Sequence, residues 1–331
     1  MVATLPHPGP KDFRPVCDQG DVPLNGAEQA YDLTIVLVAY NSDRTLAKSL
    51  QSLKDFAPQH LRYRLVVVDN NSPDGSANLV EREFPDVTLL RGPTNLGFGG
   101  GNNLAMGAYP ARYYYLHNTD AYLQQPVLDD VIHALDRATD VGIVGLPLIY
   151  PDQSPQTAAY AYSTPAKWAL QGLGVSSALK IALRWRVGRH LLAPLARTRM
   201  GKTFFRTEAG QRQGPPTNGL TPVDWVCGAS LVLRHETFME TGGFDESIFL
   251  YGEDEDLCRG AADKGWRIAQ IDTFPVVHDF GWGTRKRTSR RVARLKAESL
   301  ATFIDKHFQR GSPRWMAMHL MLWVKRRSWG A

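Results

Sequence analysis

The sequence predicts an α/β fold, built on an open, mostly parallel sheet that is flanked by helices. Two observations carry this prediction. Apolar runs rich in β-branched residues begin at Leu33 and Leu61, as is typical of strands buried on both faces. Amphipathic stretches alternate with these runs, which is the pattern of βαβ units. The 331 residues are 43% hydrophobic and 10% aromatic, so the chain can bury a substantial core.

Strands and helices alternate along the first 120 residues. LTIVLVAYN, from Leu33, is a predicted strand, and RTLAKSLQSLKDF is a predicted helix with leucines at helical spacing. LRYRLVVVDNNS supplies the second strand, NLVEREF a short helix and VTLLRG the third strand. We expect a helix over residues 102–109, followed by a fourth strand in RYYYLHNTD. Ligands of such sheets bind outside the carboxyl ends of the strands.

Three polar clusters fall at these strand ends: Tyr40–Asn41, Asp69–Asn71 and Asn118–Asp120. Each cluster alone is more typical of a turn than of a site, because Asn and Asp favour turns. Together with the glycine-rich stretch NLGFGGGNN, which starts at Asn95, they indicate a nucleotide site. Glycines let a backbone approach a ligand closely, and Asn amides can bind hydroxyls or a base edge. A flexible glycine loop is the alternative, and no GK[ST] follows to make a P-loop.

The segment GGFDESIFLYGEDEDLCRGAADKGWRIA concentrates acidic residues. Glu253 to Asp256 are four consecutive carboxylates, whose mutual repulsion can raise the pKa of one of them enough for it to act as a base. We expect a helix from Asp256 to about Lys264, with the acids at its N-terminal end, where the helix dipole favours them. Helix capping alone would explain the acids, but Tyr251–Gly252 before them indicates a loop that enters a cleft.

Asp120 and His278 are the candidate metal ligands. Asp120 ends a predicted strand with Asn118 on the same face, and it could hold Mg²⁺ or Mn²⁺ while a diphosphate supplies further oxygens. His278 ends a short apolar strand, and the basic run after it could neutralise a diphosphate. A strand-end cap and a structural histidine are the respective alternatives.

In their order, these motifs resemble glycosyltransferase family 2, the inverting enzymes with a GT-A fold, and in particular its rhamnosyltransferase-like branch. The motifs are VAYNS, VVVDNNSPDGS, NLGFGGGNN, HNTDAYL, DWVCGASLVLRHETFMETGGFDESIFLYGEDEDL and the later His278. The resemblance covers about residues 32–284, with 150–221 poorly matched. It implies an enzyme that moves a sugar from a nucleotide-diphosphate donor to a hydroxyl of a glycan or lipid-linked acceptor. It also implies dTDP-rhamnose as the first donor, a UDP-hexose as the second, and Mg²⁺ or Mn²⁺ as cofactor.

The resemblance further implies roles for single residues. Asp254 matches the catalytic base, and Glu253 lies beside it. Asp120 matches the last acid of the metal motif, whose first acid is replaced by Asn118, and His278 matches a late position that contacts metal or diphosphate. The implied donor-binding residues are Tyr40, Asn41, Asp69, Asn95, Gly97 and Asn118. The implied acceptor-binding residues are Trp225, Gly228 and Ala229.

Basic residues cluster outside the predicted sheet, at 180–206, 285–294 and 325–327, although the formal net charge is only +5. We expect a flexible tail over 1–30, a GT-A domain over 31–284 with a basic helical insertion at 150–221, and a basic helical extension over 285–331. Ser176–Met200 and the C-terminal segment combine apolar residues with arginines, which predicts docking on an anionic membrane surface. Helices packed on the sheet, with solvated arginines, are the alternative.

Other partners and functions are less favoured. Nucleic acid is a poorer partner, because the acidic loop would repel phosphates and no nucleic-acid module is recognised. The N-terminal residues lack a secretory signal and no apolar run has bilayer length, so we expect a cytoplasmic protein, in contact with the inner face of the membrane if the basic segments dock there. A sugar-nucleotide nucleotidyltransferase and a non-catalytic sugar-nucleotide or glycan-binding module are the alternative functions.

Overall fold

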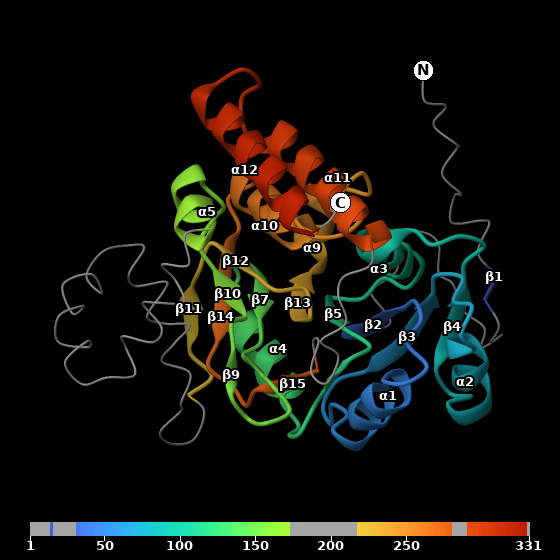
Figure 1. Ribbon diagram of the computed structural model, residues 1–331. Helices are drawn as coiled ribbons and strands as arrows, with labels where there is room; N and C mark the ends of the chain where they lie inside the picture. Colours follow the sequence, from blue (N-terminus) through green and yellow to red (C-terminus); the bar gives the residue numbers. More distant parts are fainter. Residues whose placement is uncertain (1–13, 16–30, 173–216, 280–289, 330–331) are drawn as a thin grey trace.

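The computed structural model describes residues 14–15, 31–172, 217–279 and 290–329. A nine-stranded sheet lies between two layers of helices, and a third group of helices covers one end of the molecule (Figure 1). The predicted α/β fold, an open sheet flanked by helices, is thereby confirmed. The predicted membrane segment Ser176–Met200 and the basic residues 285–287 lie outside the described residues.

One half of the central sheet is parallel. β2 (Leu33–Ala39) pairs in parallel with both β3 (Tyr63–Asp69) and β5 (Tyr113–His117), and β4 (Thr88–Arg91) continues the parallel set beside β3. The two-residue β1 (Arg14–Pro15) closes this edge in antiparallel pairing with β4. Because these four parallel strands end at the same edge, the polar residues that follow β2, β3 and β5 meet there.

The other half of the sheet is mixed. β13 (Ser230–Arg234) runs antiparallel between β5 and β7 (Val141–Gly145). β14 (Arg267–Ile271) pairs in parallel with β7, and β11 (Leu220–Pro222) forms the antiparallel edge. β13 therefore brings the residues before its start next to the end of β5.

Two small sheets complete the strands. One has the order β6-β15-β8-β9, made of β6 (Ala121–Tyr122), β15 (Val276–His278), β8 (Leu148–Ile149) and β9 (Pro155–Gln156). The other pairs β10 (Ala159–Tyr160) with β12 (Trp225–Val226). In the first, His278 lies opposite Ala121, so the antiparallel pairing places His278 beside Asp120.

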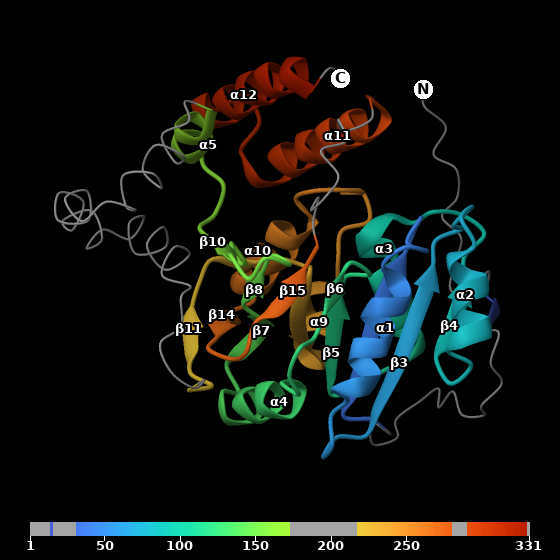
Figure 2. The same cartoon turned by 60° about the horizontal axis from the view of Figure 1, so that its bottom comes forward.

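Helices cover both faces of the central sheet (Figure 2). On one face, α1 (Leu46–Asp55), α2 (Ser76–Glu83) and α4 (Leu128–Arg137) pack against Leu33, Ile35 and Leu37 of β2. On the other, α3 (Gly97–Ala108), α9 (His235–Thr241) and α10 (Glu253–Asp263) pack against residues that include Val36. Successive residues of a strand point to opposite faces, so an apolar run feeds both cores at once.

The helix α3 begins at Gly97, so the predicted start at residue 102 was wrong and the glycine stretch is largely helical. Its glycines permit close packing. A Cβ on Gly99 would lie 2.7 Å from Cβ of Phe244, and one on Gly101 would lie 2.7 Å from Cγ1 of Val38. Glycine is unfavourable inside a helix, and close approach to β2 offsets that cost here.

The helix α10 begins at Glu253, three residues before the predicted start at Asp256. Tyr251 and Gly252 have φ angles of 71° and 107°, which turn the chain sharply into the helix. All four consecutive acids therefore occupy the first turn, where unpaired backbone N–H groups and the helix dipole stabilise negative charge.

The third group of helices consists of α5 (Pro165–Gly172), α11 (Arg290–His307) and α12 (Pro313–Trp329). They share a separate apolar core, in which Trp168, Phe303, Ile304, Met318 and Leu322 are buried. None of the helices in the described part of the chain combines the length and apolar composition that crossing a bilayer requires.

Candidate active site

A cavity of about 1150 Å³ lies at the carboxyl ends of β2, β3 and β5. The strand ends, the start of α3, the loop at Phe249–Leu250 and the first turns of α11 all contribute to its lining. This volume is large enough for a cofactor-sized ligand, and the edge is where open α/β sheets bind ligands.

Most of the residues expected to bind a donor line this cavity. They are Tyr40, Asn41, Asn95, Gly97 and Asn118, and Asp120 joins them. Asp69 does not line it: its side chain is buried beneath the cavity floor, and its Oδ2 accepts a hydrogen bond of 3.3 Å from the backbone N–H of Ser72. The neighbouring Asn70 takes the place at the cavity surface that the sequence suggested for Asp69.

Three buried acceptor oxygens around the cavity have no hydrogen-bond partner in the described part of the chain. They are Oδ1 of Asp69, Oδ1 of Asn70 and Oδ1 of Asp279. Asn70 and Asp279 also line the cavity. Buried polar atoms in folded proteins almost always have a partner, so these oxygens are suited to accept hydrogen bonds from a ligand's hydroxyl or N–H groups.

Asp120 and His278 form a pair at the edge of the cavity. Nε2 of His278 lies 3.3 Å from Oδ1 of Asp120. Nδ1 of His278 lies 2.9 Å from Oε1 of Gln156, and its Nε2 also lies 3.4 Å from Nδ2 of Asn118. A carboxylate oxygen and an imidazole nitrogen are both ligands that divalent metal ions accept, and these two atoms lie close enough to bind the same ion. The pair therefore fits a divalent cation.

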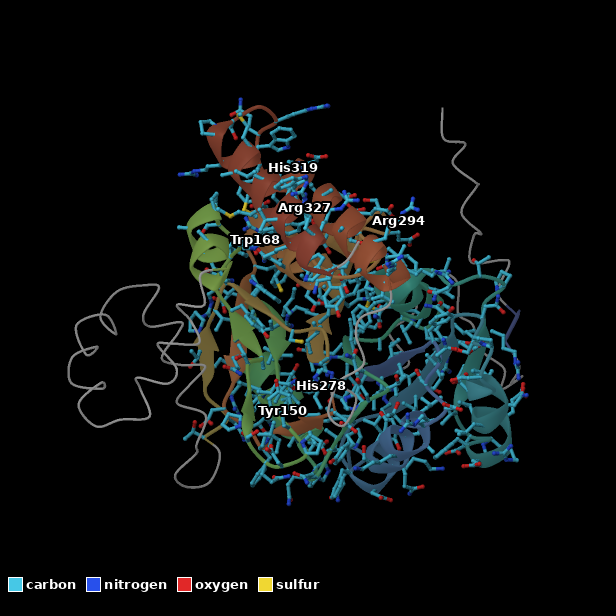
Figure 3. All side chains as sticks on the ribbon, in the orientation of Figure 1. Tyr150, Trp168, His278, Arg294, His319 and Arg327 are labelled. Atoms are coloured by element: carbon cyan, nitrogen blue, oxygen red, sulfur yellow. The ribbon has the colours of Figure 1, made fainter. Side chains whose placement is uncertain are left out.

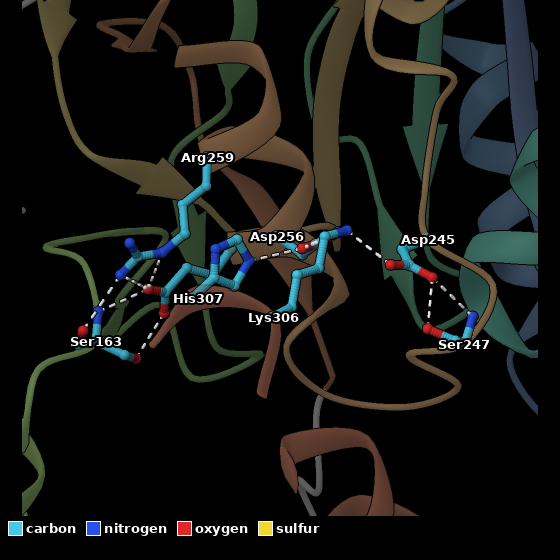
Figure 4. A network of polar contacts seen from close by, with 8 residues as sticks. Ser163, Asp245, Ser247, Asp256, Arg259, Lys306 and His307 are labelled. Carbon is cyan, nitrogen blue, oxygen red and sulfur yellow. Dashed lines mark hydrogen bonds and ion pairs between the residues drawn. The ribbon is translucent and has the colours of Figure 1, made fainter. Parts of the chain in front are cut away.

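The four consecutive acids of α10 divide into two pairs with different surroundings. Glu255 and Asp256 are held in structural contacts: Glu255 with Ser163 and Arg259, and Asp256 with Lys306 and His307 (Figure 4). Glu253 and Asp254 have no such salt bridges among the described residues. They are the carboxyl groups that remain for chemistry.

Asp254 lies at the junction between the cavity and the short strand β12. Its Oδ2 accepts a 2.9 Å hydrogen bond from the backbone N–H of Gly228. A Cβ on Gly228 would collide with Asp254 and lie 3.0 Å from Cε1 of Phe98, a ring that lines the cavity. Asp254 is thus adjacent to the cavity without lining it. Packed protein atoms remove most of the water around this carboxyl group, and this burial raises the pKa of Asp254 to about 6. Part of the surface of the residue is nevertheless accessible.

Glu253 is more deeply enclosed than Asp254. Its Oε2 has no hydrogen-bond partner in the described residues. Burial, and then the adjacent charge of Asp254, raise the pKa of Glu253 to about 8. The two groups titrate as a pair, so that near neutral pH the pair carries one proton, mainly on Glu253. Asp254 is then the ionised member.

Of the three residues expected on the acceptor side, only Gly228 has a described contact with Asp254, and none of the three lines the cavity. Gly228 binds Asp254, and the carbonyl of Ala229 accepts a 3.0 Å hydrogen bond from the backbone N–H of Asn118. The ring of Trp225 stacks on Tyr160, with centroids 4.2 Å apart and planes inclined by 16°. β12 and the start of β13 therefore connect the carboxylate to the cavity.

Several residues that line the cavity could not be expected from the sequence. Arg44 lies just before α1, Asp279 follows His278, and Arg291, Val292 and Leu295 come from α11. In the sequence, Arg291 is only one member of the basic cluster at 285–294. Its position in the sequence gives no sign that α11 returns to the cavity, because that contact spans most of the chain.

Comparison with known proteins extends these observations. A family model described as glycosyl transferase family 2 matches residues 34–187. N-acetylglucosaminyl-diphospho-decaprenol L-rhamnosyltransferase of Mycobacterium tuberculosis is 25% identical over 287 residues, covering 83% of this chain and 85% of that protein. Rhamnosyltransferase WbbL of Escherichia coli is 22% identical over 246 residues, covering 74% of this chain and 82% of that protein.

Two solved structures share the fold. The mannosyltransferase PcManGT of Pyrobaculum calidifontis, in complex with GDP-Man and Mn²⁺, matches with a TM-score of 0.50 at 16% identity, over 89% of this chain and 69% of that one. GalNAc-T7, with UDP, GalNAc and Mn²⁺, matches with a TM-score of 0.56 at 11% identity, over 91% of this chain and 55% of that one. Both are similar to this chain in the arrangement of the sheet and its helices.

Proposed function

We propose that this chain, which the glycosyl transferase family 2 model matches over residues 34–187, transfers a sugar from a nucleotide-sugar donor, and that the sugar is L-rhamnose carried by dTDP-rhamnose. A UDP-hexose is the second candidate donor. The proposed acceptor is a hydroxyl of a lipid-linked saccharide or another glycan. Support for this choice comes from the names of the two rhamnosyltransferases, one of which names a diphospho-decaprenol acceptor.

The observation that carries the proposed mechanism is the place of Asp254. Its carboxylate lies behind Phe98, at the edge of a cavity whose lining offers amides, glycine backbone and two arginines. We assign the cavity to the nucleotide diphosphate and the space near Gly228, Ala229 and Trp225 to the acceptor. Tyr40, Asn41, Asn95, Gly97 and Asn118 would then contact the donor directly, and Asp69 would act from beneath.

In this mechanism, Asp254 accepts the proton of the acceptor hydroxyl. The oxygen attacks the anomeric carbon from the side opposite the diphosphate, and the bond between that carbon and the diphosphate oxygen breaks. A single displacement inverts the configuration, and the proton later passes from Asp254 to solvent. Protonated Glu253 adds no second charge, so the negative charge beside the acceptor belongs to Asp254.

Asp120 and His278 would hold a divalent cation, for which Mn²⁺ and Mg²⁺ are the candidates. Such a cation, when bound, neutralises charge that develops on the leaving diphosphate. No group of three or more His, Cys, Asp or Glu side chains in the described ranges is placed to hold a metal ion. The diphosphate and water would therefore complete the ligand set, as is usual for these ions. Arg44 and Arg291 in the cavity lining would bind the diphosphate oxygens.

The proposed donor is tested by offering the purified protein dTDP-rhamnose, UDP-glucose, UDP-N-acetylglucosamine and GDP-mannose with Mn²⁺. The acceptor is N-acetylglucosaminyl diphosphate on a short prenyl chain. We expect a product heavier by one deoxyhexose, with dTDP released in equal amount and the anomeric configuration inverted. Faster turnover of a UDP- or GDP-sugar would replace rhamnose as the donor, and no transfer from any of them would refute the proposed acceptor.

The pH dependence of the reaction should reflect the raised pKa of Asp254. The base must be ionised, so kcat/KM is expected to fall about tenfold for each pH unit below about 6. An unperturbed aspartate, with a pKa near ~3.9, would keep full activity to about pH 5. Steady-state rates between pH 4.5 and 8.5 distinguish the two cases, and an acid limb near pH 4 would contradict the assigned environment.

Metal binding can be measured without turnover. Asp120→Asn and His278→Gln should each weaken Mn²⁺ binding in the presence of dTDP by about 10-fold or more, because each removes one of two protein ligands. Isothermal titration calorimetry gives the affinity, and Mn²⁺ paramagnetic resonance reports the free ion. Asp130→Asn, an exposed acid on α4, is the matched control. Unchanged Mn²⁺ affinity in both variants would exclude this pair as the metal site.

A further inference from the structure

The helix α12 is apolar on two sides but packs on only one. Met318 and Leu322 are buried against α5 and α11. On the opposite side lie four exposed side chains, here named the outer stripe, with exposed fractions between 50% and 61%: Met316, Leu320, Trp323 and Val324. Their spacing of four, three and one residues places them on one face of the helix. A surface helix normally exposes its polar side, so an exposed apolar stripe of this kind indicates a surface that binds a partner.

The outer stripe has basic residues at both ends and no acidic residue on its own helix. Arg314 is exposed at the start of α12, and Arg326 and Arg327 are exposed at its end. The guanidinium of Arg327 lies 3.8 Å from the ring centroid of Trp323, which joins the basic end to the apolar stripe. Asp305 of α11 is engaged elsewhere, because its Oδ1 accepts a 2.7 Å hydrogen bond from Nε1 of Trp315.

We propose that the outer stripe of α12 docks in the headgroup region of an anionic lipid bilayer. An apolar stripe that contains tryptophan and is flanked by arginines has the composition of helices that lie in a membrane interface. Apolar side chains would enter the acyl boundary, while Arg314, Arg326 and Arg327 meet lipid phosphates. This commits the outer stripe of α12 to the membrane.

A second copy of the chain fits this surface less well. Antiparallel pairing of two outer stripes would bring Arg314 of one copy towards Arg326 and Arg327 of the other. Parallel pairing would bring the two C-terminal ends together. Either arrangement places like charges opposite one another with no acid on α12 to compensate, which is unfavourable at a contact that excludes water. An anionic surface has the complementary charge.

The position of α12 also suits the proposed acceptor, and this step rests on the proposed function. The helices α11 and α12 lie together at one end of the molecule in both views (Figures 1 and 2). The first turns of α11 line the cavity, and its remaining length packs on α12. Nζ of Lys325 on α12 lies 4.1 Å from the ring centroid of Trp168 on α5. Figure 3 labels Trp168 together with His319 and Arg327 of α12 in this group of helices. Among the described helices, only α11 thus lies between the cavity and α12, which carries the outer stripe. With that stripe docked, the saccharide of a lipid-linked acceptor could enter the active site while its lipid stays in the bilayer.

The test is flotation of the full chain with vesicles of phosphatidylcholine alone or mixed with phosphatidylglycerol. We expect binding to the anionic vesicles to be at least 10-fold tighter and to weaken as salt is raised. The double variant Leu320→Glu with Trp323→Glu should lose at least 10-fold in binding, and so should Arg326→Glu with Arg327→Glu. Met239→Glu is the matched control, because Met239 is 64% exposed but lies on α9.

Two outcomes would overturn the proposal. One is vesicle binding that neither double variant changes, or no vesicle binding at all. The other is a dimer in sedimentation velocity that the Leu320→Glu, Trp323→Glu variant disperses, since the stripe would then belong to a second copy. Transfer to a short-chain, vesicle-free acceptor should be unchanged in every stripe variant. Failure of membrane docking is thereby distinguished from failure of the sugar transfer itself.

Discussion

Asp254→Asn is expected to lower kcat by about 10²- to 10⁴-fold while leaving donor binding nearly unchanged. The substitution keeps the size of the side chain and an oxygen that can accept the hydrogen bond from Gly228 N–H. It removes the group that takes the proton from the acceptor hydroxyl. Steady-state kinetics gives kcat, and calorimetry with dTDP gives the affinity of the nucleotide, which the cavity residues bind without Asp254.

The matched control for this variant is Asp263→Asn, at the exposed end of the same helix. It changes the net charge of α10 by the same amount, so it should retain kcat within about twofold if the charge of the helix is unimportant. A loss of less than tenfold in Asp254→Asn would assign the base to another residue. Glu253→Gln separates the pair, because a carboxyl group that is already protonated at neutral pH should lose little as an amide.

Glu255→Ala is expected to lower the free energy of unfolding by about 3 kcal/mol, because it leaves buried donors without partners. Glu255 accepts hydrogen bonds of 2.6 Å from both the backbone N–H and the hydroxyl of Ser163. It also accepts from Nε and Nη2 of Arg259, at 3.0 and 2.8 Å. These contacts attach α10 to the segment that leads into α5 (Figure 4 shows Ser163 and Arg259). Urea unfolding followed by circular dichroism measures the change.

The control for Glu255→Ala is Glu298→Ala, which also removes one carboxylate of an i,i+4 pair with arginine. Its partner Arg294 and Glu298 itself are largely exposed, with side-chain exposures of 74% and 51%. Water replaces such contacts readily, so the unfolding midpoint should not move measurably. Equal effects of the two substitutions would show that burial at Glu255 does not add to the strength of its contacts.

The strands that carry the cavity could be predicted from local sequence. β2 and β3 are continuous apolar runs, and a parallel pair buried on both faces needs such runs. Once these strands are placed in one sheet, the polar residues after them must share an edge. The positions of Tyr40, Asn41, Asn118 and Asp120 in the cavity follow from that rule.

The starts of two helices could not be predicted in this way. Four glycines between Asn95 and Asn103 have poor helix propensity, yet α3 includes all of them. Packing against Phe244 and Val38 leaves no room for a Cβ at Gly99 and Gly101. The helix α10 was expected to begin at Asp256, but it begins at Glu253, so that all four acids lie in its first turn, where negative charge is stabilised. For α3, contacts with other elements outweighed a local preference.

The residue types and their order were enough to predict the fold class and most of the cavity's strand-end residues, because strand burial and turn chemistry act over short stretches of chain. Three features are properties of the folded chain alone. They are the division of the four neighbouring acids into structural and chemical pairs, the wall that α11 adds to the cavity, and the exposed stripe of α12. They depend on Ser163, Lys306 and Arg291, which approach the site from distant segments. Burial, hydrogen-bond partners and exposure are set by such long-range contacts, and a local pattern carries no record of which segments will meet.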